Sequence, residues 1–473
     1  MIGHDVKADI AQVCRIMAHH GMLDLWGHLS LRVPRSEVIL VTPRFTRDCL
    51  PRGITASDIL VCSPDGHLLE GKGALPLQFG VDLALYRTHK NRGGCIFSGP
   101  PTALAAGIAR YALKPLTHME SVIAYGLNYF EADELAESEP AAQQLAERIA
   151  AGTATHQPGL GVWVAGTDIF DCLTAVYHLE YLAQANLLLA GEETAEVARE
   201  DSDKLWQQFS GHHHYHEFFM SLDPGPLAHP YPAFLDACTP DDEPFAELKA
   251  AIAFSCRALW QRDTLVAFLE HISHRLPVDN RFLMSASRNF RDMTPKDICL
   301  LDYQANWLAG PRPPNFKWFH AQLLAERTDA QAVVHTHDLY GRVYALAQRT
   351  LQPCFRVGLD IATRNLPCYS RCDLIVDPEV RRQTLDALGD GPLVHEIGHG
   401  TDFVAATLEQ ATVDAIQREA FLAMHNLAER FGTPRPLPPR MVERLRALEP
   451  GHDDWWWYYT GEVSAPRRSA GGL

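Results

Sequence analysis

The sequence contains an internal duplication, and this limits the possible folds more than any other feature. Residues 9–34 and 251–277 each carry an apolar-periodic helix, then a short β-like segment, and each closes on His-x-Ser-x-Arg-x-Pro. The later matches, in chain order, are Asp58 with Asp297, Asp82 with His320, and Glu180 with Glu419. Landmarks that recur in the same order at a nearly constant spacing indicate two copies of one domain.

The pattern inside each copy predicts an α/β fold. Helical stretches alternate with short β-branched runs, for example at 37–41 and 332–334. This alternation favours a layered domain in which helices cover a sheet. The predicted domains are residues 1–190 for the first copy, 191–240 for a linker, 241–432 for the second copy and 433–473 for a C-terminal tail.

Two segments outside the copies have unusual composition. Residues 211–216 read GHHHYH and are followed by a Pro-rich stretch, which favours a solvated linker over a metal-binding cluster. Residues 453–459 read DDWWWYY. Because so many adjacent aromatic side chains are costly to leave in water, we expect them to dock on the body of the protein or on a neighbouring subunit.

Charge and composition exclude several classes of partner. The chain has 42 Lys and Arg against 58 Asp and Glu, a net charge of −16, which disfavours nucleic acid and anionic membranes as general partners. No apolar run approaches the ~18 residues of a membrane span, and the first residues lack the pattern of an export signal. The 11 scattered cysteines are typical of reduced thiols, so we expect a cytoplasmic protein.

A His-x-His pair is the strongest chemical signal. His335 and His337 follow the β-branched run 332–334, and residues two apart on a strand face the same way. Both rings can therefore point at one ion, and His399 is the best candidate for a third ligand. The alternative is two histidines that share no ligand.

A second interpretation of the region around His399 is a zinc protease. Residues 395–399 match H-E-x-x-H, which requires a helix through all five residues. Glycines at 391, 398 and 400 disfavour that helix. His399 also corresponds to Leu160 at the offset of the neighbouring landmarks, so this segment belongs to the duplicated domain.

Together these elements resemble the class II aldolase/adducin family, over roughly residues 5–190 and again over 245–432. The shared elements are the His-x-Ser-x-Arg segment, the T-x-x-D-I stretch, the His-x-His strand, the later His-Gly and a Glu in the next helix. The resemblance implies two tandem class II aldolase-like α/β/α sandwich domains with a largely antiparallel central sheet. It also implies a homo-oligomer with active sites between adjacent subunits, so we expect two chains to form a pseudo-tetramer.

The resemblance assigns the metal ligands to His335, His337 and His399, with one divalent ion (Zn, Fe or Mn) per chain. The first copy departs from this pattern: Ser98-Gly-Pro100 and Leu160-Gly161 stand where the ligands are expected. None of these residues can replace an imidazole. We therefore expect the first copy to be metal-free and to serve as structure or as a neighbouring wall of the site.

The second copy also departs from the aldolases. Those enzymes place a catalytic Glu at the position of Phe316, and the first copy has Gln78 there. Neither side chain can remove a proton. Lys317 and His320 are thus the candidates for acid–base catalysis, with an ordinary surface lysine as the alternative for Lys317.

The early motif of the second copy supplies candidates for substrate binding. His271, Ser273 and Arg275 match the family's substrate-binding segment, and Phe316 is expected to line the same site. Arg275 could grip a carboxylate in a bidentate pair, or it could form a structural salt bridge.

These residues predict a metal-dependent lyase that cleaves a C–C bond of a small hydroxy- or oxo-acid. The missing Glu favours decarboxylation over retro-aldol cleavage, because loss of CO₂ needs no initial proton abstraction. Two alternatives stay open: a non-haem iron oxygenase on the same three histidines, and a non-catalytic adducin-like scaffold. The expected partner is a small-molecule substrate, without a nucleotide cofactor.

Overall fold

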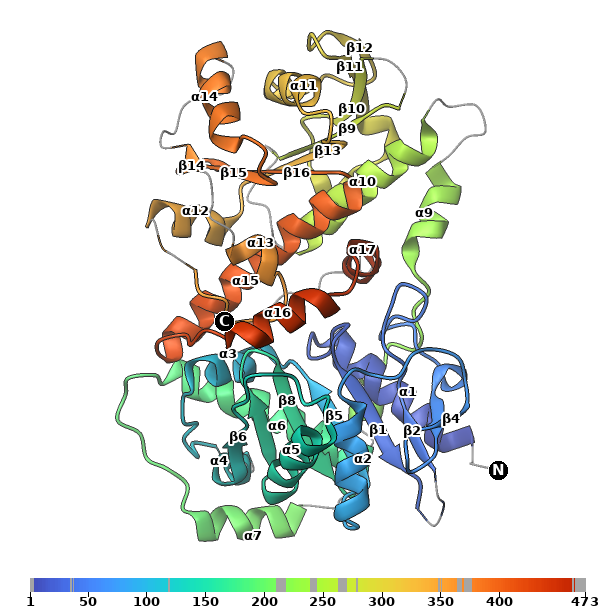
Figure 1. The fold of residues 1–473 in the computed structure, drawn as a ribbon, viewed down its shortest axis with the longest axis vertical. Helices are drawn as coiled ribbons and strands as arrows, with labels where there is room; N and C mark the ends of the chain where they lie inside the picture. The colour runs from blue at the N-terminus through green and yellow to red at the C-terminus, as the bar shows by residue number, and fades with distance from the viewer. Residues whose placement is uncertain are drawn as a thin grey trace. The chain divides into compact units, whose positions relative to one another are not determined.

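The computed structural model describes residues 4–34, 36, 38–117, 120–209, 218–238, 245–262, 270–277, 280–347, 349, 351–363, 368–369, 377–461 and 463. The histidine-rich residues 211–216 lie outside this part of the chain. Two compact units form (Figure 1). Unit 1 comprises Met1–Leu227, Gln352–Leu359 and Met424–Pro450; unit 2 comprises Ala228–Leu351, Asp360–Ala423 and Gly451–Leu473.

Unit 1 is built on an eight-stranded sheet with the order β4-β3-β2-β1-β5-β8-β7-β6. The strands are β1 (His28–Arg32), β2 (Ile39–Val41), β3 (Leu60–Cys62), β4 (Leu68–Glu70), β5 (Gly94–Ser98), β6 (Leu127–Tyr129), β7 (Ala154–Gln157) and β8 (Gly161–Gly166). Neighbouring strands are antiparallel except for β6 and β7.

The helices described before residue 228 are α1 (His4–His19), α2 (Phe79–Thr88), α3 (Pro101–Ala109), α4 (Ser121–Gly126), α5 (Glu139–Ala151), α6 (Ile169–Leu188) and α7 (Arg199–Phe209). Helix α6 begins sharply because the Asp168 carboxylate accepts from the Phe170 and Asp171 backbone N–H groups, both at 2.9 Å.

Unit 2 repeats the sheet with the order β12-β11-β10-β9-β13-β16-β15-β14. The strands are β9 (His271–Arg275), β10 (Arg281–Ser285), β11 (Ile298–Asp302), β12 (Trp307–Ala309), β13 (Ala332–Thr336), β14 (Cys368–Tyr369), β15 (Leu393–Glu396) and β16 (Gly400–Ala405). The only parallel pair described in this sheet, β14 with β15, matches β6 with β7. The prediction of two tandem, largely antiparallel α/β domains is therefore confirmed.

The remaining helices are α9 (Pro230–Cys238), α10 (Ala246–Gln261), α11 (Lys317–Glu326), α12 (Leu339–Leu346), α13 (Leu359–Thr363), α14 (Pro378–Leu388), α15 (Leu408–Phe431), α16 (Pro439–Leu448) and α17 (His452–Thr460). Helix α16 belongs to unit 1, and α15 begins in unit 2. Because the units are not continuous in sequence, the domain boundaries drawn from sequence stay predictions.

One face of the unit 2 sheet carries both a buried hydrophobic cluster and the histidine His335. Val333 of β13 packs in a buried cluster with Phe319 of α11 and Leu385 of α14. His335 lies two residues further along the same strand and so faces the same side. The helices α11 and α14 thus cover the face on which His335 sits.

Two of the repeated sequence landmarks have structural roles. Thr55 with Asp58 and Thr294 with Asp297 each form a capping box at a short 3-10 helix. The Glu419 carboxylate accepts from the Tyr340 and Gly341 N–H groups at the start of α12. Glu180 does the same for α3 in unit 1. These acidic residues satisfy backbone donors at helix starts.

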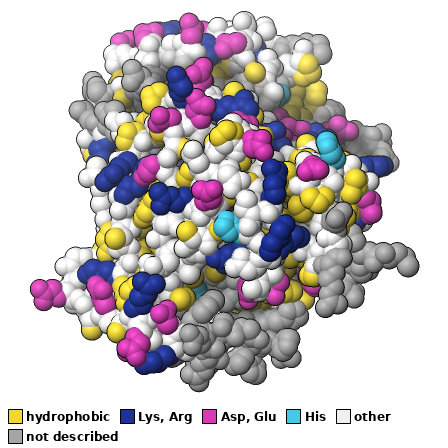
Figure 2. Space-filling view, turned by 60° about the horizontal axis from the view of Figure 1, so that its bottom comes forward, with side chains coloured by type: hydrophobic (Ala, Val, Ile, Leu, Met, Phe, Trp, Pro, Cys, Tyr) yellow, Lys and Arg dark blue, Asp and Glu magenta, His cyan; other side chains and the backbone are white. Residues whose placement is uncertain are grey.

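Acidic and basic side chains are interspersed over the face of the molecule that Figure 2 presents. Among the described helices, none is both long and apolar enough to cross a bilayer.

The aromatic segment of the sequence forms α17, which packs within unit 2 against α10. Trp455, Trp456 and Tyr459 are buried. Trp456 Nε1 donates to Ser255 Oγ at 3.1 Å, and its ring lies 5.1 Å from that of Tyr231. Docking on the body of the protein, one of the two expected placements, is the one observed.

Replacing Trp456 with alanine should lower the free energy of unfolding by about 3–5 kcal/mol, because it leaves a cavity and an unpaired Ser255 hydroxyl. Denaturant titration of the purified variant measures the loss. Tyr458→Ala, at a half-buried position of the same helix, is the control and should cost clearly less. Equal losses would contradict the assigned role of Trp456.

Candidate metal centre

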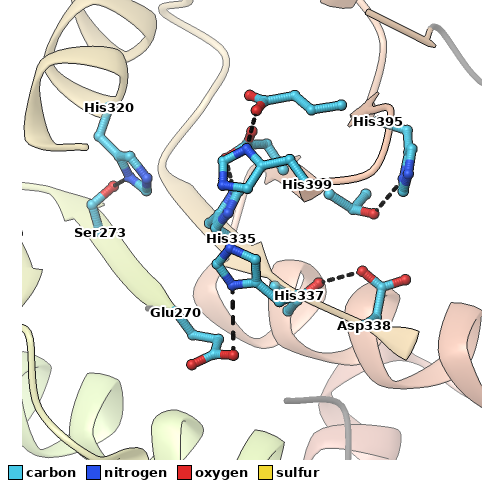
Figure 3. Close-up of polar contacts among 12 residues, drawn as sticks. Glu270, Ser273, His320, His335, His337, Asp338, His395 and His399 are labelled. Atoms are coloured by element: carbon cyan, nitrogen blue, oxygen red, sulfur yellow. Dashed lines mark hydrogen bonds and ion pairs between the residues drawn. The ribbon is translucent and has the colours of Figure 1, made fainter. Parts of the chain in front are cut away.

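Three histidines converge at one end of the unit 2 sheet. His335 lies near the end of β13, His337 directly follows that strand, and His399 lies in the turn before β16 (Figure 3). One candidate ligand atom from each ring lies within 4.8 Å of the others. The strand pairing creates this cluster, because β13 and β16 are adjacent and antiparallel with His335 opposite Asp402.

Each of the three rings has its Nδ1 atom beside a buried carboxylate. The pairs are His335 with Asp402 (hydrogen bond, 3.0 Å), His399 with Glu396 (hydrogen bond) and His337 with Glu270 (ion pair, 3.6 Å). A carboxylate that accepts from Nδ1–H leaves the lone pair on Nε2 and orients the ring. His335 and His399 have this hydrogen bond, which is the usual support behind histidine ligands of a metal ion, while His337 Nδ1 faces Glu270 without a hydrogen bond within the described residues.

The opposite edges of the rings meet the requirements of a metal site. Within the described residues, His335 Nε2 and His337 Nε2 are buried and have no hydrogen-bond partner. Gly400 leaves room beside them, since a Cβ atom there would lie 3.1 Å from His335 Nε2 and 2.3 Å from the Thr336 carbonyl oxygen. Buried nitrogens without a partner are costly, so the cluster could hold a divalent ion with an open coordination position.

Burial sets the protonation of the cluster. It lowers the pKa of His335 and of His271 well below the usual value, and neighbouring histidines add to this. Burial raises the pKa of Asp402 to about 7. At His399, burial acts to lower the pKa, but the hydrogen bond and charge of Glu396 raise it above the usual value. The neutral imidazole of His335 is the form that binds metal ions.

The structure brings three further predicted residues to the same place. The His271 ring stacks on the His335 ring, with centroids 4.7 Å apart, because the two residues are paired across β9 and β13. Ser273 Oγ lies 2.6 Å from His320 Nδ1 (Figure 3). Burial lowers the pKa of His320 to about 3, so this ring is neutral. A polar, uncharged wall thus borders the three histidines.

Phe316 lies directly over this group. Its ring centroid is 5.7 Å from that of His335, 5.3 Å from His399 and 5.2 Å from His271. A cavity of about 480 Å³ opens beside it, with Arg288, Arg312 and Asn315 in its lining. The side chain that replaces the aldolases' Glu is therefore next to the histidines and also lines a cavity.

Two predicted residues have other neighbours. Lys317 Nζ lies 5.1 Å from the ring centroid of Trp318, and the described contacts do not join it to the histidines. Arg275 donates to the carbonyl oxygens of Ala330, Leu324 and Arg327 and to the Tyr303 hydroxyl. These bonds favour a structural role for Arg275, but one based on backbone carbonyls and a tyrosine hydroxyl and not on the salt bridge offered as the alternative.

The sequence reasoning did not identify the supporting carboxylates Glu270, Glu396 and Asp402. Glu396 had a possible role only within the zinc-protease interpretation. That interpretation is wrong, because residues 393–396 form strand β15 and His399 follows in a turn. A signal was present for Asp402: it is the one charged residue of strand β16, directly before the apolar run Phe403–Ala405, and a buried charge needs a partner.

Arg418 is a second group that sequence reasoning missed. It is fully buried on α15, where Nη1 lies 3.5 Å from Asp338 Oδ2 and 3.3 Å from Thr401 Oγ1. Asp338 directly follows His337, and its other oxygen accepts from Thr336 Oγ1 at 2.9 Å. Arg418 thus holds the turn that carries His337.

Strand register corrects the match between the copies by one residue. His335 pairs with His271 and Asp402, as Phe97 pairs with His28 and Trp163. The counterparts of the His-Thr-His segment are therefore Phe97, Ser98 and Gly99, where the sequence comparison suggested residues 98–100. None of these counterparts carries an imidazole, so the prediction that the first copy lacks these ligands is unaffected.

The chain is thus a tandem α/β protein with two mostly antiparallel sheets. One of its two domains has a histidine cluster able to hold a metal ion. The family model described as "Class II Aldolase and Adducin N-terminal domain" matches residues 8–187 and 250–425. Both copies are covered, so the chain belongs to the class II aldolase and adducin family.

Curated relatives carry out several reactions. A 3,4-dihydroxyphthalate decarboxylase of Arthrobacter keyseri is 32% identical over 188 residues, covering 36% of this chain and 74% of the relative. A 5-methylthioribulose-1-phosphate/5-deoxyribulose-1-phosphate aldolase of Rhodospirillum rubrum is 30% identical over 155 residues, covering 33% and 69%. A 4-hydroxy-3-prenylphenylpyruvate oxygenase/4-hydroxy-3-prenylbenzoate synthase of Streptomyces roseochromogenus subsp. oscitans is 25% identical over 171 residues, covering 36% and 61%. The decarboxylase and aldolase relatives support a lyase.

Changing Asp402 to asparagine should weaken metal binding by about 10- to 100-fold, because the carboxylate that orients His335 is lost. Competition with a chelator of known affinity measures the change. Asp386→Asn is the control, since that side chain is 64% exposed and pairs with Arg382 on α14. Unchanged affinity in Asp402→Asn would show that the carboxylate does not support the site.

Proposed function

We propose that this chain is a metal-dependent lyase that decarboxylates a small hydroxy- or oxo-acid. The observation that carries the proposal is the cluster of His335, His337 and His399, in which each ring lies beside a carboxylate. The Nε2 atoms of His335 and His337 are buried and have no hydrogen-bond partner within the described residues. When bound there, a divalent ion (Zn, Fe or Mn) would act as a Lewis acid and stabilise the negative charge left on the substrate.

Phe316 favours decarboxylation over retro-aldol cleavage. Retro-aldol chemistry needs a base that removes a hydroxyl proton, and a phenyl ring cannot do this. In decarboxylation the C–C bond breaks, its electron pair stays on the substrate carbon, and no base is required first. The aromatic ring instead keeps water away from the three histidines.

The surrounding residues support an acidic substrate. Arg312 lines the cavity beside Phe316 and would attract a carboxylate, whereas Arg288, in the same lining, already pairs with Asp297 at 2.8 Å. After CO₂ leaves, the substrate carbon must receive a proton. His320 is neutral, so it would deliver this proton by relay: Nε2–H gives up its proton while Nδ1 takes one from the Ser273 hydroxyl, which water replaces. Lys317 lies against Trp318 and is less well placed. His271 would form one wall of the substrate site.

An iron-dependent oxygenase is the second candidate. It is favoured by the oxygenase among the relatives and by three neutral nitrogen ligands, which leave positions for both substrate and O₂. The ligand set is the same for both reactions, so the bound metal and the consumed reactant distinguish them.

Elemental analysis of anaerobically purified protein tests the proposal, and we expect one divalent ion per chain. His335→Ala should lose it. His395→Ala is the control, because His395 Nδ1 bonds to Thr401 Oγ1 instead of joining the cluster. The loaded protein should then release CO₂ from a dihydroxylated aromatic acid such as 3,4-dihydroxyphthalate, and His335→Ala should not.

Other results would redirect the assignment. One iron per chain with substrate-dependent O₂ consumption would favour the oxygenase. Cleavage of a ketose phosphate without CO₂ release would favour an aldolase. No bound metal in any variant would leave the non-catalytic scaffold.

We also propose a homo-oligomer in which α12 contacts a second copy of the chain. Val343 and Leu346 are 46% and 60% exposed on one face of α12. Their counterparts in unit 1, Ala105 and Ile108 of α3, are fully buried. An apolar face that is covered in one copy of a duplicated domain and exposed in the other favours an interface on the exposed one.

Leu346→Glu should therefore lower the mass measured by light scattering towards that of a single chain, because a charge in an apolar interface is costly. Leu69→Glu, at a leucine that is also 60% exposed, should leave the mass unchanged. A wild-type protein that is already a single chain would contradict the interface.

A further inference from the structure

Arg356 is buried in unit 1, although it comes from the second half of the sequence. Arg356 is 1% exposed, and it belongs to the segment Gln352–Leu359. Its Nη2 atom lies 2.8 and 2.7 Å from the two carboxylate oxygens of Asp24. Its Nη1 donates to the carbonyl oxygen of Leu160, and its backbone N–H donates to the Gly159 carbonyl at 3.0 Å.

The place is the counterpart of the three-histidine cluster. In unit 1 the β7–β8 pairing closes with Gln157 opposite Gly161, as β15–β16 closes with Glu396 opposite Gly400. The two turns have the same length, and each has a glycine with positive φ at the same position: 77° at Gly159 and 72° at Gly398. Leu160, which binds Arg356, therefore stands where unit 2 has His399.

The counterparts of the other two ligands, His337 and His335, also lie close to Arg356 or are filled by aromatic rings. Gly99 occupies the position of His337, and a Cβ atom on it would lie 3.1 Å from Arg356 Nη2. Phe97 occupies the position of His335, and its ring stacks on that of Trp163 at 4.6 Å. The Trp163 side chain itself replaces Asp402. The aromatic rings of Phe97 and Trp163 thus replace His335 and Asp402, and the guanidinium lies where a side chain at position 99 would otherwise reach.

We propose that the first copy has exchanged the three-histidine centre for a guanidinium-binding site, in which Arg356 is the resident cation. Asp24 neutralises the charge, and the carbonyl of Leu160 accepts a further N–H. The absence of a Cβ at residue 99 provides the space. The site recognises a planar, fork-shaped cation, which an ammonium group cannot replace at equal strength.

This assignment explains why a domain without the three histidines keeps its fold at that end of the sheet. Loss of the buried histidines would otherwise leave polar backbone groups, such as the Leu160 carbonyl, without partners. It depends on the duplicated fold and on contacts within unit 1. It does not require that the His335 cluster bind a metal.

Chemical rescue tests the proposal. Arg356→Ala should lower the melting temperature by about 10 °C, because Asp24 loses its cation and a cavity remains. Sub-denaturing guanidinium chloride should then raise the melting temperature of this variant relative to sodium chloride at equal ionic strength. Arg47→Ala, at an arginine of unit 1 that is 51% exposed, is the control and should only lose stability in guanidinium.

Further variants keep the test decisive if Arg356→Ala does not fold. Asp24→Asn should lower the melting temperature, because the buried Arg356 loses its counter-ion. The double variant Asp24→Asn/Arg356→Ala should show no stabilisation by guanidinium, because the carboxylate that accepts the cation is missing. Arg356→Lys should melt between the wild type and Asp24→Asn. Stabilisation of Arg356→Ala by sodium chloride as much as by guanidinium would overturn the proposal, as would a wild-type melting temperature in Asp24→Asn. Metal content is not part of the readout, so a failure of the proposed lyase function is distinguishable.

Discussion

The in-register pairing of β13 with β9 on one side and β16 on the other is the constraint from which the site follows. It places His271, His335 and Asp402 in one row across three strands. Side chains opposite one another on adjacent antiparallel strands share a face, so a shift of β13 by one residue would turn His335 away from the face that holds His271 and Asp402. The turn before β16 then brings His399 to the same point, and the end of β13 brings His337.

The carboxylates make this arrangement energetically acceptable. A buried imidazole without partners loses the hydrogen bonds that it makes with water. Asp402, Glu396 and Glu270 each stand behind one ring, and the Nε2 edges are left for a ligand. The charge of these carboxylates would in turn be costly without a cation nearby. The histidines and their carboxylates therefore depend on one another, and an ion bound between the histidines would offset the charge of the carboxylates.

The two copies solve the same packing problem with different chemistry. Where unit 2 has His335 and Asp402, unit 1 has the stacked aromatic pair Phe97 and Trp163, whose one polar group, the Trp163 indole N–H, donates to Gln157 at 3.0 Å. If one histidine or carboxylate of the unit 2 cluster is replaced, the others stay buried without a partner, which is unfavourable. The cluster is therefore expected to change as a whole. The residues that the copies still share, such as Glu180 and Glu419, satisfy backbone donors that both folds possess.

The amino-acid sequence by itself determined the duplication, the α/β class and the candidacy of His335, His337 and His399, because repeats and strand periodicity are local patterns along the chain. Only the tertiary structure decided which carboxylates stand behind the histidines, that Arg275 binds backbone carbonyls, and that Phe97, not Ser98, is the counterpart of His335. It also revealed Arg356, 196 residues from Leu160 in sequence, at the first copy's altered site. Such contacts depend on strand register and on the packing of segments that are far apart in the sequence. Neither can be inferred from a short stretch of sequence.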